Sequence, residues 1–315
     1  MLPGQVWYRK FAVGLVFFAV FSNQASVAEE SMSVAATNYL SALSVDDREQ
    51  SVFSLDDEER LNWHFVPHEM FPRSGILLKQ LNPQQREFAQ TLLASGLSER
   101  GYLTVTSIIQ LERVLNALEP DGPFVRDYEN YRVSVFGTPE SEGSWGWRFE
   151  GHHLSLHFTI VAGEVTVSSP TFLGSNPAEV RSGAQTEQQQ NQRVLAARED
   201  SGRSLVTALS DLQRTRAITS DTAPRDIVTG AQYPIDPLTP AGIRAGELND
   251  SQQQLLRDVI DAYTATMSAA IAEKRWSKIR EQDFGDIHFA WSGPVERGEA
   301  HYYRVQGESF LIEYD

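Results

Sequence analysis

The strongest alternation of hydrophobic and polar positions in this sequence runs from His152 to Ile160. Leu154, Leu156 and Phe158 occupy alternate positions, and the residues between them are polar. A period of two residues is typical of a β-strand that buries one face. A short glycine-containing turn and a second apolar run follow, so the pattern predicts a β-hairpin.

Other stretches repeat their hydrophobic positions every three or four residues, which is the period of an amphipathic helix. Asn82 followed by Pro83 indicates a helix start, because asparagine caps the first turn and proline is tolerated there. Two of the predicted helices meet at a corner that contains glycines and form a helical hairpin. The predicted helices cover residues 33–43, 82–97, 103–118, 195–217 and 250–277.

Short runs rich in aromatic and β-branched residues predict further strands. These strands cover residues 63–66, 131–137, 286–292, 301–306 and 310–314. The three nearest the C-terminus follow one another without helices between them, which favours antiparallel pairing. We therefore expect an α+β fold class, with helical hairpins packed on antiparallel β-hairpins in a single mixed domain.

The net charge argues against a nucleic-acid partner. The formal charge is -15 at pH 7, whereas proteins that bind phosphate backbones gather lysine and arginine on one surface. Apart from one N-terminal run, no apolar stretch approaches the roughly 20 residues of a membrane span. We therefore expect no nucleic acid and no membrane contact beyond the N-terminal segment.

The N-terminal segment has the features of a secretory signal. Arg9 and Lys10 precede the apolar run Phe11–Phe21, and Ser26–Ala28 supplies small residues for cleavage. The pattern predicts a signal peptide over residues 1–28 and a secreted or periplasmic protein. An uncleaved N-terminal anchor is the alternative.

The remaining chain divides by composition. Residues 29–60 contain a predicted helix followed by an acidic connector, and residues 61–315 form the main domain. The sequence contains no cysteine, which excludes disulfides, thiolate nucleophiles and cysteine-ligated metals. Any metal ligands must therefore be histidine, aspartate or glutamate.

Four of the seven histidines are candidate metal ligands, namely His152, His153, His288 and His301. All are predicted on or beside strands, and histidine is the commonest ligand of catalytic metals. We predict that one of the adjacent pair joins the other two around a divalent ion. Zinc is the first expectation, with copper or iron as alternatives.

Three charged residues are candidate catalytic groups. Glu150 or Glu313 would act as general base towards a metal-bound water, and Arg304 would clamp a substrate carboxylate. The alternative for Glu150 is an ordinary ion pair with Arg148, which lies two residues away on the same strand face.

Several tryptophans surround these residues. Trp145, Trp147 and Trp291 form either an aromatic wall for an organic ligand or part of the hydrophobic core, and core packing is the commoner role. Buried histidines with hydrogen-bond partners are also common in proteins. A metal-free protein with His152 and His153 in its core is therefore an alternative.

Four segments together resemble a bacterial family known as DUF3500. They are WGWRFEGHHLSLHFTI, PTFLGSNPA, IHFAWSG and HYYRVQGESFLIEYD, and predicted helices lie between the second and the third. The resemblance runs from about Leu61 to Asp315. This family has no established activity, so the resemblance implies domain extent and export rather than a reaction.

The resemblance also implies a C-terminally truncated domain. Members of the family continue after the EYD motif with an Asn-Thr-Gln run and a His-Ile-His motif, whereas this sequence ends at Asp315. A His-x-His pair on a strand places two imidazoles on one face about 7 Å apart, which suits metal chelation. A truncated gene, a fragment and a divergent member all remain open, and without this pair metal binding is expected to be weak.

The sequence thus predicts an exported, metal-dependent hydrolase that acts on a small organic substrate. It has no GxSxG elbow, Walker loop or dinucleotide-binding motif. The alternatives are a metal-free ligand-binding or structural protein, and a copper or iron oxidoreductase. The sequence leaves open whether the protein is an enzyme, and it determines neither the substrate nor the oligomeric state.

Overall fold

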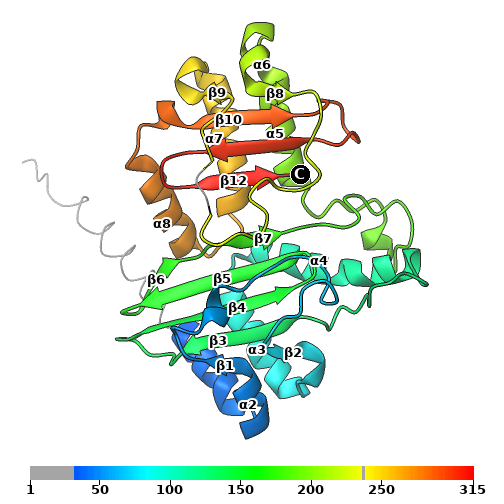
Figure 1. Cartoon of the computed structure of the whole chain (residues 1–315), viewed down its shortest axis with the longest axis vertical. Helices are drawn as coiled ribbons and strands as arrows, with labels where there is room; N and C mark the ends of the chain where they lie inside the picture. Colours follow the sequence, from blue (N-terminus) through cyan, green and yellow to red (C-terminus); the bar gives the residue numbers. More distant parts are fainter. Residues whose placement is uncertain (1–31, 236–237) are drawn as a thin grey trace, which may run out of the picture.

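The computed structural model describes residues 32–235 and 238–315. Figure 1 shows two halves, one above the other, each consisting of a β-sheet with helices packed against it. The α+β fold class predicted from the sequence is confirmed. The predicted signal peptide over residues 1–28 lies outside the described residues.

The first half contains a mixed sheet. Its strands are β1 (Val52–Phe53), β2 (Ile76–Leu77), β3 (Arg132–Gly137), β4 (Ser144–Gly151), β5 (Leu154–Val161), β6 (Glu164–Val167) and β7 (Thr171–Leu173). They lie in the order β1-β3-β4-β5-β6, with β2 beside β3 and β7 beside β5. The pair β1–β3 is parallel and the others are antiparallel, so the sheet is not built of hairpins alone.

The second half contains a smaller mixed sheet. Its strands are β8 (Ile218–Ser220), β9 (Ile243–Arg244), β10 (His288–Ser292), β11 (Tyr302–Gln306) and β12 (Leu311–Tyr314). The order is β12-β11-β10-β8, with β9 also paired to β10. The pair β8–β10 is parallel, as β1–β3 is in the first half.

The helices bury their apolar faces against these sheets. An N-terminal helix covers residues 32–42. The others are α2 (Val45–Ser51), α3 (Pro83–Ser95), α4 (Glu99–Leu118), α5 (Ala196–Ala208), α6 (Asp211–Ala217), α7 (Asp250–Thr264) and α8 (Ala269–Arg280). Each half has its own large hydrophobic cluster, although Met267 and Ile271 from the second half pack into the cluster of the first.

Some local predictions are wrong. The helix predicted over residues 195–217 is divided into α5 and α6, because Ser210 caps a new helix with its side chain. The helix predicted over residues 250–277 is likewise divided into α7 and α8. Residues 63–66 form no strand, and the acidic connector contains α2.

The two halves repeat the same order of elements, which the sequence analysis did not detect. The clearest sign is a pattern of Gly-Ile, Leu-Asn and Gln that occurs at residues 75–85 and again at residues 242–252 with identical spacing. Gly75 and Gly242 both have positive φ, 95° and 89°. Both lie so close to the backbone of the paired strand that a side chain would not fit.

Equivalent hydrogen bonds support the repeat. The Gln85 Nε2 donates to the carbonyl of Ala42 at 3.0 Å, and the Gln252 Nε2 donates to the carbonyl of Ala208 at 2.9 Å. In both halves this bond ties the start of the helix after the Leu-Asn pair to the helix that begins the half. The helix over residues 32–42 is therefore equivalent to α5, and α2 is equivalent to α6.

The halves meet at the corners of their helical hairpins. Ser98 N donates to the carbonyl of Thr266 at 3.2 Å, and Ser268 N donates to the carbonyl of Gly96 at 3.1 Å. The two bonds are equivalent, because swapping the two halves turns each bond into the other. A pseudo-twofold axis therefore passes through this junction, and it aligns α3 and α4 with α7 and α8.

Candidate functional site

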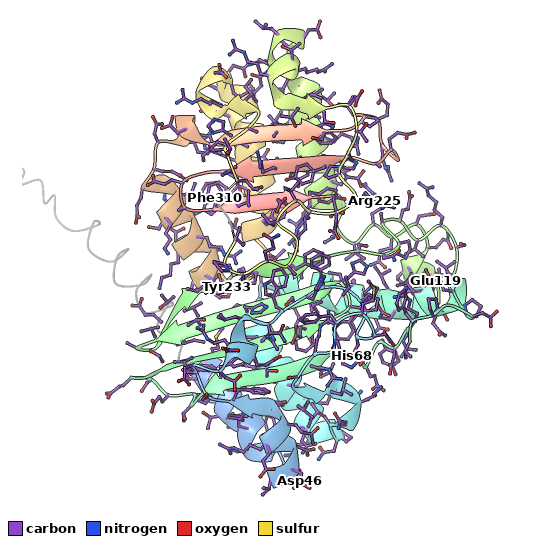
Figure 2. All side chains as sticks on the ribbon, in the orientation of Figure 1. Asp46, His68, Glu119, Arg225, Tyr233 and Phe310 are labelled. Carbon is purple, nitrogen blue, oxygen red and sulfur yellow. The ribbon has the colours of Figure 1, made fainter. Side chains whose placement is uncertain are left out.

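A cavity of about 480 Å³ lies between the two halves. Much of its wall comes from two segments that cross the sheets, the first strap (residues 58–67) and the second strap (residues 224–230). Figure 2 shows Arg225, from the second strap, beside the edge of the second sheet that faces the first half. Phe65 and Phe172 stack with their ring centroids 4.0 Å apart and give the cavity an aromatic wall. Concave sites of this size with aromatic walls are typical binding sites for small molecules.

The first strap is held by a buried arginine. Arg148, on β4 opposite His157, donates to the carbonyls of Glu59 and Asn62 at 2.7 and 2.8 Å. It also forms an ion pair of 2.6 Å with the Glu59 carboxylate. Arg148 therefore holds the part of the first strap that comes just before Trp63. Trp63 and the residues after it line the cavity.

The predicted catalytic Glu150 belongs to the same buried network. Its carboxylate lies 2.7 Å from Arg148 and 3.5 Å from Arg73, and its side chain is 1% exposed. Arg73 in turn donates to the carbonyls of His64 and Val66 in the first strap. Glu150 does not line the central cavity, so its contacts are those of the ion-pair alternative.

The other predicted catalytic residues, Arg304 and Glu313, lie in the second half at the positions equivalent to Arg148 and His157. Arg304 and Glu313 face each other on β11 and β12. Glu313 lines the cavity, but it accepts hydrogen bonds from Val228 N at 2.7 Å and from the Tyr302 hydroxyl at 2.8 Å, so it fastens the second strap. Arg304 donates to the carbonyl of Thr239 and does not line the cavity.

His152 and His153 form the turn between β4 and β5, not the first residues of a strand. His153 has a φ of 57°, which is unusual for a residue with a side chain. Its N–H donates to the carbonyl of Phe65, and its carbonyl accepts from Gly174 N, both at 2.8 Å. These bonds hold the turn against the first strap, and both histidines line the central cavity.

Gly174 is necessary for the position of His153. A Cβ on Gly174 would lie 2.5 Å from the Nδ1 of His153. That Nδ1 is buried and has no hydrogen-bond partner among the described residues. The ring centroids of His152 and His153 are only 4.0 Å apart.

A short polar contact joins His152, in the cavity wall, to Glu112, which lies behind it and does not line this cavity. The Glu112 Oε1 lies 2.5 Å from the His152 Nδ1, and their side chains are 5% and 12% exposed. Burial raises the pKa of Glu112 to about 7, although Arg126 opposes this shift. Burial also lowers the pKa of His152 to about 3, with Arg126 and Arg73 acting in the same direction. Both shifts favour the uncharged forms.

A contact of 2.5 Å requires a proton between the two atoms. When Glu112 is protonated it donates to Nδ1, and the neutral imidazole carries its own hydrogen on Nε2. When Glu112 is ionised it accepts from Nδ1–H, and Nε2 carries a free lone pair. Because the pKa of Glu112 is about 7, this carboxyl determines whether Nε2 donates or accepts near neutral pH.

The two remaining candidate ligands lie elsewhere. His301 stacks on Trp291 at 4.8 Å and lines a second cavity of about 620 Å³, while its ring bonds to the carbonyl of Glu299 at 3.0 Å. His288 lies on β10 between β9 and β11, opposite Gln306. Among residues 32–235 and 238–315, no group of three or more histidine, aspartate or glutamate side chains is placed to hold a metal ion.

The three tryptophans have the core-packing role that was the commoner of the two expectations, and they do not form an aromatic wall. Trp145, Trp147 and Trp291 are buried in the two hydrophobic clusters.

Among the described residues, no helix is both long and apolar enough to cross a bilayer.

Glu112 is a functional candidate that the sequence analysis missed. It follows Ile108 by four residues, so it lies on the apolar face of α4. An acidic residue on the buried face of a helix is the local sign that it has a specific partner. Its partner is 40 residues away in sequence, and no motif connects the two.

Comparison with known proteins places the chain in a family. The family model described as a protein of unknown function (DUF3500) matches residues 25–315, and the chain belongs to this family. The resemblance seen in the sequence is thereby confirmed. No curated protein and no solved structure matches the chain.

Proposed function

We propose that the protein binds a small organic molecule in the central cavity and acts on it by general acid–base catalysis. His152 is the base, and Glu112 sets the protonation of its ring. The observation that carries this proposal is the 2.5 Å contact between Glu112 and His152, a residue in the wall of a cavity of about 480 Å³.

Hydrolysis of an ester or amide is the reaction class that this pair suits best. Nε2 takes a proton from a water molecule while the water oxygen bonds to the substrate carbonyl carbon. The imidazolium that forms is stabilised by the Glu112 carboxylate on Nδ1. The same proton then moves from Nε2 to the leaving oxygen or nitrogen as its bond to carbon breaks.

A metal-dependent version is the second candidate. A carboxylate that holds one ring nitrogen of a histidine is also typical of metal sites, and His153 lies next to His152. In this version His152 and His153 bind zinc, copper or iron. The metal-free version is favoured, because the described residues supply no third side chain of a suitable type at this place.

We also propose that the protein acts in the periplasm or outside the cell. The support is the basic and then apolar N-terminal sequence, followed by small residues suited to cleavage. A fusion of residues 1–40 to a reporter that is active only after export tests this proposal. Loss of reporter activity on changing Leu15 and Phe17 to arginine is the expected result.

Turnover of 4-nitrophenyl acetate and 4-nitrophenyl butyrate by the purified protein tests the reaction. We expect the change His152→Gln to reduce the rate by about a hundredfold or more. His301→Gln, a histidine outside the central cavity, is the matched control. Equal rates for wild type and His152→Gln would contradict the proposal, and loss of activity after chelation with recovery on adding zinc would favour the metal version.

A further inference from the structure

One arginine in the wall of the central cavity has no anionic partner. Arg198, on α5, is 6% exposed and lines the cavity. Its guanidinium lies over the ring of Tyr263 at 4.3 Å. It donates one long hydrogen bond of 3.5 Å to the carbonyl of Leu173. Among the described residues, no carboxylate comes within the 4.0 Å of an ion pair.

The deeply buried arginines of the first half differ from Arg198 in this respect. Arg148 is paired with both Glu59 and Glu150, and Arg73 is paired with Glu150. The carboxylate next to Arg198 in sequence, Glu199, is bound instead by Arg193 at 2.5 Å and by Arg203 at 2.9 Å. A buried cation without a counter-charge is strongly unfavourable, since arginine does not lose its proton in proteins.

A second cation lies close to the first. Arg275 is held by oxygen atoms of Ser168 and Thr171 and has no carboxylate partner among the described residues. Burial lowers its pKa to about 10, with the charge of Arg198 acting in the same direction. Thr171 and Leu173 both line the cavity, so both guanidinium groups are hydrogen-bonded to this part of its wall.

The internal repeat shows that this cation is not required by the fold. Counting back along the equivalent helices from Ala42 and Ala208, Arg198 occupies the position of Met32 in the first half. Met32 is 1% exposed and belongs to the hydrophobic core. The same position thus carries an apolar side chain where it faces a core and a cation where it faces a cavity.

We propose that Arg198 binds the carboxylate of an organic ligand in the central cavity. This inference rests on the proposed use of the cavity and specifies the class of ligand. A guanidinium matches a carboxylate through two parallel hydrogen bonds. One cavity-facing buried guanidinium balances one negative charge, whereas a phosphate dianion requires several donors. The stacked rings of Phe65 and Phe172 favour an aromatic or other flat apolar group beside the carboxylate.

The first test needs no ligand. Arg198→Met introduces the residue that the first half has at the equivalent position, and we expect the melting temperature to rise by about 4 °C, because an unpaired buried charge is removed. Arg148→Met is the contrasting variant, and it should lower the melting temperature, because it removes an ion-pair partner from both Glu59 and Glu150. A fall in melting temperature for Arg198→Met comparable to that of Arg148→Met would show a structural role and overturn the proposal.

The second test compares benzoate with benzamide, its neutral analogue, by isothermal titration. We expect benzoate to bind the wild-type protein at least tenfold more tightly than benzamide. Arg198→Met should weaken benzoate binding about tenfold or more and change benzamide binding less than twofold. Arg198→Gln serves as a second variant if the methionine does not pack. Arg216→Gln is the control for the loss of an arginine charge, because Arg216 is exposed and does not line the cavity, and it should bind benzoate as the wild type does.

The outcomes separate this inference from the proposed function. Equal binding of benzoate and benzamide, or unchanged binding of benzoate to Arg198→Met, overturns the anionic ligand alone. Tighter binding of inorganic phosphate than of benzoate overturns the carboxylate. If neither aromatic compound binds, the use of the cavity fails together with this inference. If the carboxylate preference holds but His152→Gln hydrolyses esters at the wild-type rate, only the proposed reaction fails.

Discussion

Glu112 and Gln282 occupy equivalent positions in the two halves, and each contacts the turn of the hairpin in its own half. Glu112 meets the His152 side chain at 2.5 Å, whereas the Gln282 Oε1 accepts from the backbone N–H of Glu308 at 2.6 Å. The contact between helix segment and turn is therefore part of the repeated fold. In the first half, both partners of this contact are ionisable side chains, whereas in the second half an amide side chain meets a backbone N–H. The proposed chemistry is therefore placed in the first half.

The first prediction concerns the tautomer of His152. Below pH 7 we expect a hydrogen on Nε2, and above pH 7 a hydrogen on Nδ1, because Glu112 has a pKa of about 7 and shares a proton with Nδ1. The nitrogen chemical shifts of the ring, measured by NMR from pH 5 to 9, report this change. Glu112→Gln should abolish it, since an amide does not titrate. An unchanged tautomer across this range in the wild type would contradict the assignment.

The second prediction concerns stability as a function of pH. The pKa of Glu112 is raised above 4.5 in the folded protein. Its stabilising contribution to the free energy of unfolding is therefore fully present below pH 4.5 and is lost as pH rises towards 7. The lowered pKa of His152 acts oppositely, and its contribution is lost as pH falls from 6.5 towards 3. Glu112 alone should therefore lower the free energy of unfolding by about 2–3 kcal/mol between pH 5 and pH 8. Glu112→Gln should not show this decrease. Urea unfolding at both pH values measures this difference.

An exposed glutamate provides the control for this measurement. Glu87 lies on the solvent side of α3, and Glu87→Gln should leave the difference between pH 5 and 8 as it is in the wild type. If the Glu112→Gln and Glu87→Gln proteins show the same pH dependence, the raised pKa of Glu112 is refuted.

The third prediction concerns the network beneath the first strap. Glu150→Gln leaves the buried Arg73 and Arg148 with less counter-charge, and we expect a loss of about 3–5 kcal/mol in the free energy of unfolding. Glu273→Gln removes a surface ion pair with Arg280 instead and should cost less than about 1 kcal/mol. Denaturant titration of both variants measures the contrast. Similar losses for the two would mean that the buried network does not hold the strap.

The fourth prediction concerns the room that Gly174 provides. Gly174→Ala places a Cβ 2.5 Å from the His153 Nδ1, so the double-histidine turn must move and the ester turnover assigned to His152 should fall about tenfold or more. Gly246→Ala is the control, because a Cβ there meets its nearest neighbour at 3.4 Å. Turnover by Gly174→Ala at the wild-type rate would show that the position of the turn does not matter.

The sequence predicted elements whose signals are local. The helix after Asn82 begins where the capping residue and Pro83 placed it, and the strand with alternating residues forms β5. The long predicted helices were divided, because Ser210 and the corner after Thr264 interrupt a periodicity that continues across them. The repeated Gly-Ile, Leu-Asn and Gln pattern was also present in the sequence. The match of Arg198 with Met32 needed the structure, because the segment between the first helix and the glutamine is one residue longer in the second half.

By itself, the sequence determined the fold class, the membership of the family and the turn region that carries His152. These follow from side-chain periodicity, helix caps and motifs, which act over a few residues. The tertiary structure alone decided that Glu112, and not His288 or His301, is the partner of His152, and that Arg198 faces a cavity without an anion. Such pairings depend on how two packed halves bring distant segments together, and that arrangement leaves no signal in the spacing of residues along the chain.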